Sequence, residues 1–363
     1  MKLSDFDYVL PAGQIAQRPL EDRAASRMLL VDRAAASDED RKFRDFPSLL
    51  RGDELIVVNN ARVIPARLLG RRVKRLENVG DSDERLAGTG EIEVLLSRQM
   101  DTNAWEALVR PGRKMHVGQR VQFGGGDLEA EVVGRGEHGQ RTLRFTALVN
   151  GTVTEQLERL GHVPLPPYIE RADESADRER YQTIFARRSG AIAAPTAGLH
   201  FTAEILERIR ARGAEICELT LHVGLGTFQP IRGETLEDHI MHGEAYEISP
   251  ETCKRIARAR REGRRVVAIG TTTVRALEDA ALRARAGGDG IVASGKAEAH
   301  LFITPGFRFQ VVDALLTNFH LPRSTLLALV CAFAGRERIL AAYRHAVAAG
   351  YRFYSYGDCM LIK

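Results

Sequence analysis

The sequence lacks most features that place a protein in a class at first sight. It has few cysteines, four in 363 residues, and they have neither metal-ligand nor redox spacing. A reduced, cytoplasmic setting therefore fits best. No apolar run is long enough to span a membrane, and residues 1–10 carry Asp5 and Asp7 where a signal peptide has an apolar centre. We therefore expect no membrane association. The cysteines are Cys217, Cys253, Cys331 and Cys359.

A strong charge bias is also absent. Lys plus Arg total 52 against 48 for Asp plus Glu, a formal net charge of +4. So small an excess does not identify a nucleic-acid-binding protein, and any sign of that function must come from where the charges lie. What the chain does have is length and apolar content. With 363 residues and 44% hydrophobic side chains, it can form two domains with proper cores.

Three zones of the chain differ in pattern. Residues 1–62 contain short strands separated by polar loops. Residues 63–150 consist of short, mostly alternating apolar runs broken by turn residues such as Pro111-Gly112, which is typical of a small antiparallel barrel or sandwich. From residue 151 onward helical and strand patterns alternate, which predicts a mixed α/β layer with partly parallel strands. We expect the polar stretch 74–90 to be a hairpin excursion.

The most informative segment is Thr317–Leu327, a polar cluster between two apolar runs. Thr, Asn, His and Arg side chains cost free energy near a core unless each finds a partner. Ser324 or Thr325 can cap the apolar helix that follows, and Gly335 can end it. Because open α/β sheets bind ligands where strand ends face helix N-termini, the segment predicts a ligand site. The alternative is an ordinary loop before a capped helix.

A glycine motif at Leu221–Phe228 follows a predicted strand and contains Gly-x-Gly. Phe228-Gln229-Pro230 stands where a dinucleotide-binding fold needs a third glycine and a helix, so we reject that interpretation. His222 in this motif is either a structural or a catalytic histidine.

The run His239-x-x-His242-x-Glu244 has the residue types of a metal site. The helical zinc motif needs two histidines four residues apart on one face, whereas this segment leads into a predicted strand. We favour a polar strand that lines a cleft and expect no metal.

Two further loops carry polar groups. The segment Gly270–Arg275 predicts a tight turn and a helix N-terminus, where free N–H groups favour a carboxylate or phosphate, although a plain threonine cap is the alternative. Thr196 and His200 lie in a loop of small residues that lets a flat ligand approach the backbone, or that is an ordinary tight turn.

One predicted helix carries a basic stripe. Four cations between residues 250 and 265 recur at helical spacing on one face. Such a stripe either follows a phosphate backbone or is simply a solvated face. Its members are Lys254, Arg258, Arg261 and Arg265.

Taken together, these motifs resemble the S-adenosylmethionine:tRNA ribosyltransferase-isomerase family from end to end. One departure is Ala299-His300, where the family usually has Thr-Asp, and it weakens any catalytic role for that position. The resemblance rests on the segments 14–19, 58–63, 165–169, 194–202, 222–228, 241–244, 270–275, 317–327 and 355–358.

The resemblance implies an antiparallel β-barrel domain, residues 63–150, inserted into a mixed α/β domain of residues 1–62 and 151–363. It implies transfer and isomerisation of the ribosyl moiety of S-adenosylmethionine onto 7-aminomethyl-7-deazaguanine at the wobble position of tRNA with a GUN anticodon. The reaction forms epoxyqueuosine, releases adenine and methionine, and is a step in queuosine biosynthesis. S-adenosylmethionine is consumed as a substrate, and that chemistry requires no metal or second cofactor. We expect a monomer.

Individual roles come from side-chain chemistry, since the resemblance assigns none. Proton transfer, methionine carboxylate binding, ribose or adenine binding, and wall formation are the roles to fill. For proton transfer the candidates are His200, His222, Asp313 and His320. For substrate binding they are Thr196, Thr271, Thr272, Arg275, Thr317, Asn318, Arg323, Tyr356 and Asp358.

Two other classes compete with this interpretation. A methyltransferase would also use S-adenosylmethionine, but the missing glycine fingerprint argues against it. A tRNA-binding module without catalysis would use the barrel and the basic stripe, and it would leave the polar cluster at 317–325 unexplained.

Overall fold

The computed structural model describes residues 1–34, 38–74, 86–137, 139–224, 233–236, 239, 241, 243–288 and 290–363. Parts of three predicted features lie outside these residues. They are most of the 74–90 excursion, the second half of the glycine motif from Leu225, and His242 of the proposed polar strand.

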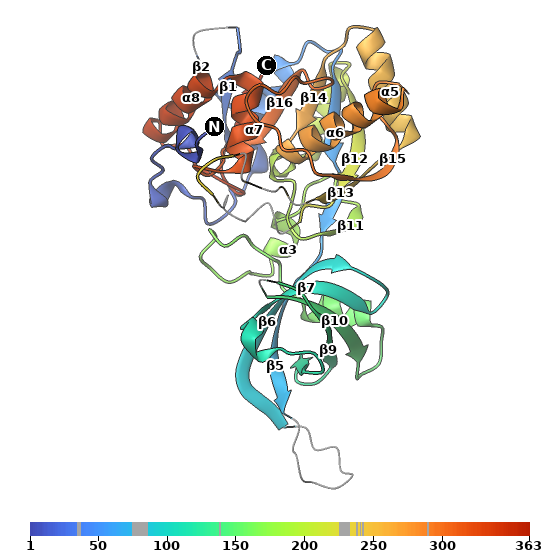
Figure 1. The fold of residues 1–363 in the computed structure, drawn as a ribbon. Helices are drawn as coiled ribbons and strands as arrows, with labels where there is room; N and C mark the ends of the chain where they lie inside the picture. The colour runs from blue at the N-terminus through green and yellow to red at the C-terminus, as the bar shows by residue number, and fades with distance from the viewer. Residues whose placement is uncertain are drawn as a thin grey trace. The chain divides into compact units, whose positions relative to one another are not determined.

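The chain divides into two compact units. One, the α/β unit, comprises Met1–Arg62, Pro166–Ala172 and Arg180–Lys363. The other, the barrel unit, comprises Val63–Leu165 and Asp173–Glu179, so it continues beyond residue 150. The predicted fold class, mixed α/β with an antiparallel β-barrel, is confirmed, and Figure 1 shows both parts.

The barrel unit is built from antiparallel strands that close on themselves in the order β10-β7-β6-β5-β8-β9. Along β10, Arg141, Leu143 and Phe145 are buried and alternate with more exposed residues, as the sequence pattern predicted. Gly70 faces the interior, and a Cβ there would lie 2.6 Å from the Phe123 ring. A larger residue would therefore displace a core aromatic. The strands are β5 (Arg67–Lys74), β6 (Leu86–Gln99), β7 (Ala104–Arg110), β8 (Arg120–Phe123), β9 (Leu128–Arg135) and β10 (Gln140–Ala147), and helix α2 (Val153–Leu160) follows.

The α/β unit contains a nine-stranded sheet of order β15-β13-β12-β3-β14-β16-β17-β1-β2. Strands β12, β3, β14 and β16 pair in parallel, so their carboxyl ends share one edge. β17 pairs antiparallel with β16 and parallel with β1. The strands are β1 (Arg27–Val31), β2 (Asp38–Lys42), β3 (Leu55–Asn59), β12 (Glu215–Leu221), β13 (Glu244–Ile248), β14 (Val266–Ile269), β15 (Gly295–Ala299), β16 (Ala314–Asn318) and β17 (Cys359–Ile362). A separate pair joins β4 (Ala61–Val63) with β11 (Arg188–Ala191).

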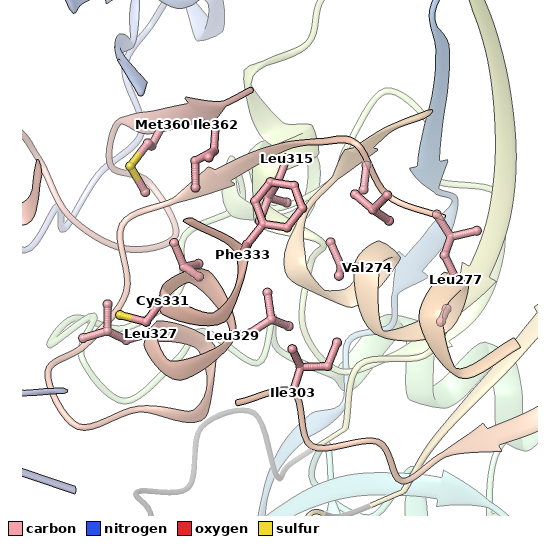
Figure 2. Packing of buried hydrophobic residues seen from close by; sticks show 14 of the residues in the cluster. Val274, Leu277, Ile303, Leu315, Leu327, Leu329, Cys331, Phe333, Met360 and Ile362 are labelled. Carbon is pink, nitrogen blue, oxygen red and sulfur yellow. The ribbon is translucent and has the colours of Figure 1, made fainter. Parts of the chain in front are cut away.

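Successive residues of a strand point to opposite faces of this sheet, and both faces are buried, as is typical of a mainly parallel sheet. Leu315 of β16 packs in one core with residues of α5 to α8, whereas Leu316 packs in a second core with residues of α1 and α4. Figure 2 shows Leu315, Val274 of α6 and Phe333 of α7 within the first core. The helices of this unit are α1 (Phe46–Leu49), α4 (Ala203–Ala211), α5 (Pro250–Arg261), α6 (Thr271–Gly287), α7 (Thr325–Ala334) and α8 (Arg336–Ala348), and α3 (Asp177–Arg180) lies mostly in the barrel unit. None of the described helices is long and apolar enough to cross a membrane.

Helix starts follow the capping pattern of the sequence. The side chains of Thr202, Ser249 and Ser324 accept backbone N–H bonds at the starts of α4, α5 and α7. α7 ends at Gly335 as predicted. α6 differs, because Gly270 with φ +90° precedes it and Thr273 Oγ1 donates to the Ile269 carbonyl instead of capping. The first-turn N–H groups of α6 therefore lack a threonine cap.

Candidate functional site

A cavity of about 340 Å³ lies at the carboxyl edge of the parallel strands, within the α/β unit. Gly270 and Thr271 enter its lining directly after β14, and Thr317 and Asn318 enter it as the last residues of β16. Val223 contributes from the turn after β12. The strand ends and the first turn of α6 therefore form the ligand position that an open α/β sheet offers.

Aromatic and small residues form the rest of the wall. The Tyr168 and Tyr354 rings lie 4.3 Å apart between centroids and present a surface on which a flat ring can pack. Small side chains leave room for the backbone to approach a ligand. The complete lining is Pro167, Tyr168, Tyr181, Ala193, Ala194, Pro195, Thr196, Ala197, Val223, Gly270, Thr271, Thr272, Thr317, Asn318, Phe319, His320, Leu321, Ser324, Leu326, Tyr354 and Ser355.

Three buried hydroxyls of this lining have no hydrogen-bond partner among the described residues. They are Thr272 Oγ1, in the first turn of α6, and the hydroxyls of Tyr181 and Tyr354. A buried polar group without a partner costs free energy, so a ligand or a water molecule that bonds to it would be stabilising. All three belong to side chains that line the cavity, which favours it as a binding site.

His320 is held rigidly at the cavity. Its Nε2 lies 2.8 Å from Thr317 Oγ1, its backbone N–H donates to the Tyr343 hydroxyl at 3.0 Å, and its carbonyl accepts from the Tyr8 hydroxyl at 2.5 Å. Burial lowers the pKa of His320 to about 3. The imidazole is therefore neutral near pH 7, and its ring can form hydrogen bonds with a ligand.

His200 lies behind the cavity wall and orients it. Asn318 Nδ2 donates to the Tyr354 carbonyl at 2.8 Å, so Asn318 Oδ1 turns to His200 Nε2 at 3.3 Å. His200 Nδ1 lies 2.9 Å from Ser26 Oγ. Burial lowers the pKa of His200 to about 4, so a neutral ring donates Nε2–H to Asn318. His200 thus fixes Asn318 and does not line the main cavity.

The structure does not bring Arg275 to the cavity. Its guanidinium is buried in an ion pair with Glu244 and also donates to the carbonyls of Leu301 and Ala299. Glu244 Oε1 in turn accepts the Gly224 N–H at 3.2 Å. This arrangement ties α6 to the strand β13, and the N-terminus of α6 offers an anion its N–H groups without the arginine.

Asp313 and Arg323 also lie away from the lining. Asp313 precedes β16, at the amino edge of the parallel strands, where it accepts from Arg260 at 2.8 Å and from the Val266 N–H at 2.8 Å. Arg323 is exposed and pairs with Asp7. Neither residue touches the cavity.

Tyr356, Asp358 and His222 surround the site without lining the main cavity. Tyr356 and His200 line a small neighbouring cavity of about 20 Å³. Asp358 accepts the backbone N–H groups of Arg27 and Arg352, both at 2.8 Å, and burial raises its pKa. His222 follows β12, and burial lowers its pKa. Asp358 therefore supports the loop before β17.

The C-terminal part of the basic stripe of α5 lies at the amino edge of the parallel strands. Arg258 pairs with Glu215, the first residue of β12, at 2.7 Å, and the neighbouring Arg260 pairs with Asp313 at 2.8 Å. Lys254 and Arg261 are exposed. The cavity opens at the carboxyl edge, so the structure does not bring this stripe and the cavity together.

The described residues do not support a metal site at the run from His239 to Glu244. They contain no group of three His, Cys, Asp or Glu side chains placed to hold a metal ion. Glu244 is engaged by Arg275, and His242 lies outside the described residues.

Sequence reasoning missed the aromatic wall. Tyr168, Tyr181 and Tyr354 come from three loops whose approach to the strand ends depends on tertiary structure. The sequence offers a local signal at Pro167-Tyr168, where a large aromatic residue follows proline in a loop. Such a loop cannot cover the tyrosine ring alone, so the ring is expected to pack against another part of the fold.

Comparison with known proteins decides the family. The family model described as queuosine biosynthesis protein matches residues 3–362. The chain belongs to this family. The S-adenosylmethionine:tRNA ribosyltransferase-isomerases of Solibacter usitatus and Moorella thermoacetica are 53% and 50% identical to it, with 100% of both chains covered in each case. The resemblance inferred from the motifs is confirmed, and so is the expectation that the chain is an enzyme.

A solved structure supports the same assignment. The crystal structure of S-adenosylmethionine tRNA ribosyltransferase from Thermotoga maritima is 36% identical, has a TM-score of 0.53, and covers 99% of this chain and 100% of its own.

Proposed function

We propose that this enzyme transfers and isomerises the ribosyl moiety of S-adenosylmethionine onto 7-aminomethyl-7-deazaguanine at the wobble position of tRNA with a GUN anticodon. The products are epoxyqueuosine in the tRNA, adenine and methionine. The observation that carries the proposal is the cavity at the carboxyl edge, with its aromatic wall, its three buried hydroxyls that have no partner among the described residues, and a neutral His320. Membership of the queuosine biosynthesis family supports it.

The cavity has places for the parts of S-adenosylmethionine. The adenine ring packs on the Tyr168–Tyr354 wall, and the methionine carboxylate accepts N–H groups at the start of α6 beside Thr272. The ribose then lies near Thr317 and His320 at the end of β16. A cavity of about 340 Å³ falls within the range of small-molecule sites.

The chemistry needs a proton acceptor and a way to release adenine. The sulfonium acidifies the neighbouring 5′ C–H, and His320 takes that proton to start opening of the ribose ring. The neutral aminomethyl group of the tRNA attacks the anomeric carbon, and adenine leaves with a proton. Asn318, fixed by His200, and the Thr317 hydroxyl offer hydrogen bonds to the ribose during these steps.

The other candidates have supporting positions. We assign Arg275 and Asp358 to holding the cavity walls in place, and Asp313 to anchoring β16 at its amino end. His222, proposed from the sequence for proton transfer, and Tyr356 and Arg323, proposed for substrate binding, lie outside the lining of this cavity, and we assign them no step of the reaction. The enzyme acts as a monomer without a metal or second cofactor.

Product analysis tests the proposal. We expect purified enzyme, S-adenosylmethionine and precursor-modified tRNA to release adenine and methionine in equal amounts with a chelator present, as measured by mass spectrometry. Methylated tRNA without free adenine would indicate a methyltransferase. Failure to bind S-adenosylmethionine in calorimetry would indicate a binding module, and activity lost on chelation and restored by zinc would contradict the metal-free mechanism.

A further inference from the structure

The barrel unit carries an open groove of about 680 Å³ whose lining has more positive than negative side chains. The groove lies between the loop that follows β7 and the turn that joins β9 to β10. Four arginines and one glutamate line it. The lining is Val109, Arg110, Gly112, Arg113, Arg135, Gly136, Glu137, Gly139 and Arg141.

Arg141 builds the groove. Its side chain is buried, and it donates to the carbonyls of Gly112, Met115 and Gln140 at 2.6 Å each. It thereby fixes the loop after β7 against β10. The pKa of Arg141 is lowered by burial and by the nearby cation of Arg135. The groove is therefore a rigid feature with an excess of positive charge.

The cations at its rim differ from other arginines of the same barrel. Arg67 pairs with Glu93 at 2.7 Å, and Arg120 pairs with Glu131 at 2.9 Å. By contrast, Arg110, Arg113 and Arg135 are exposed and have no carboxylate partner among the described residues. Cations that keep no internal partner are available to an external anion.

The glycines of the groove let its two loops approach each other closely. A Cβ on Gly112 would lie 3.3 Å from Gly139 Cα and 3.5 Å from the Arg141 guanidinium. A side chain at Gly112 would therefore press on the facing loop and on Arg141. Glycine at this position allows the loops that carry the cations to stay close together.

We propose that this groove binds the phosphate backbone of the tRNA substrate through Arg110, Arg113 and Arg135. Spaced, solvent-accessible guanidinium groups beside an open groove suit a polyanion that passes through, and they bind phosphate without reading sequence. The inference rests on the proposed function, because it takes tRNA to be the substrate. It places tRNA contacts on the barrel, whereas the cavity of the α/β unit binds S-adenosylmethionine.

Charge reversal in the groove tests this inference. We compare an Arg113→Glu, Arg135→Glu variant with an Arg71→Glu, Arg144→Glu control, which removes equal charge from exposed barrel residues outside the groove. Binding of a tRNA transcript is measured by fluorescence anisotropy at several salt concentrations, and S-adenosylmethionine binding by calorimetry. For the groove variant we expect tRNA affinity to fall on the order of tenfold and the salt slope to fall by roughly 0.7 to 0.9 per lost contact. S-adenosylmethionine affinity should stay unchanged.

The possible outcomes distinguish a failure of the groove inference from a failure of the proposed function. If the groove variant and the control weaken binding equally, or if the slope of the groove variant is unchanged, the groove inference is wrong although the enzyme still acts on tRNA. If the unmodified enzyme itself neither binds tRNA nor forms product, the proposed function is wrong, and the groove inference that rests on it is wrong as well. A milder Arg113→Gln, Arg135→Gln variant repeats the test should charge reversal disturb folding, and thermal melting of each variant monitors that.

Discussion

At the scale of single residues, the neutral histidine is the part of the site with the clearest chemical consequence. His320 is buried and bonded through its ring, its N–H and its carbonyl, so its position is fixed by three other residues, Thr317, Tyr343 and Tyr8. Burial keeps this imidazole neutral near pH 7, so one ring nitrogen carries no proton, and it also makes the ring a weaker base than an exposed histidine.

We predict that His320→Gln lowers kcat by about a hundredfold or more, the usual contribution of a general base, while S-adenosylmethionine affinity changes little. Glutamine keeps a hydrogen bond to Thr317 but cannot accept the proton. Single-turnover kinetics and calorimetry measure the two effects. His345→Gln, which alters an exposed partner of Asp40, is the matched control. Wild-type turnover by the His320 variant would remove this residue from catalysis.

The same residue carries a pH signature. Because burial lowers the pKa of His320 to about 3 from an unfolded value near 6.5, the unfolded state binds more protons between these values. Its stabilising contribution is therefore complete above about pH 6.5 and is lost as pH falls toward 3, by up to roughly 1.4 kcal/mol per pH unit. Urea unfolding of His320→Gln between pH 7 and 5 should show a correspondingly weaker loss of stability than wild type.

At the scale of elements, α5 shows how a helical stripe depends on where its helix lies. The spacing of Lys254, Arg258, Arg261 and Arg265 puts them on one face, and the structure puts that face at the edge opposite the cavity. Arg258 is already paired with Glu215, which also pairs with Arg255 and Arg264. A role of this stripe in tRNA binding stays a prediction, and position weighs against it.

We therefore predict that Lys254→Glu combined with Arg261→Glu leaves the salt slope of tRNA binding unchanged. Both residues are exposed, so the substitutions should cost little stability. Binding isotherms at several salt concentrations decide the question. A slope reduced by roughly 0.7 to 0.9 per residue would show that the stripe contacts phosphates.

Local features of these elements could be predicted from the sequence, and long-range ones could not. The caps at Thr202, Ser249 and Ser324 depend on residues three positions away, which periodicity and capping rules capture. Arg275 was expected to hold a carboxylate, and it holds that of Glu244, 31 residues away, where no local rule points. Asp313 precedes a strand instead of following it, which puts it at the far edge of the sheet.

At the scale of the whole molecule, each of the two units has its own buried core. The barrel closes through its own strands and has its own buried side chains, and the α/β unit has two cores. The alternation in residues 63–150 could be predicted because inward and outward residues alternate along each barrel strand. The return of the chain through 166–172 could not, because its partner Gln17 lies far away in sequence.

We predict that replacing residues 63–165 of the barrel unit with a short linker leaves the α/β unit folded but abolishes most tRNA-dependent turnover. The folded unit should keep its circular dichroism signature and its S-adenosylmethionine binding, since every described cavity residue belongs to it. Wild-type turnover by the shortened protein would show that the barrel is dispensable.

The position of β17 in the sheet has a kinetic consequence. Among the described residues, the paired strands β1 and β2 join the rest of the sheet through β17, in a pairing that brings Met28 next to Cys359. Closing so long a loop costs entropy before any contact repays it, and pairings of this kind slow folding. We therefore expect the pairing of β1 with β17 to be among the slower steps in the folding of this sheet.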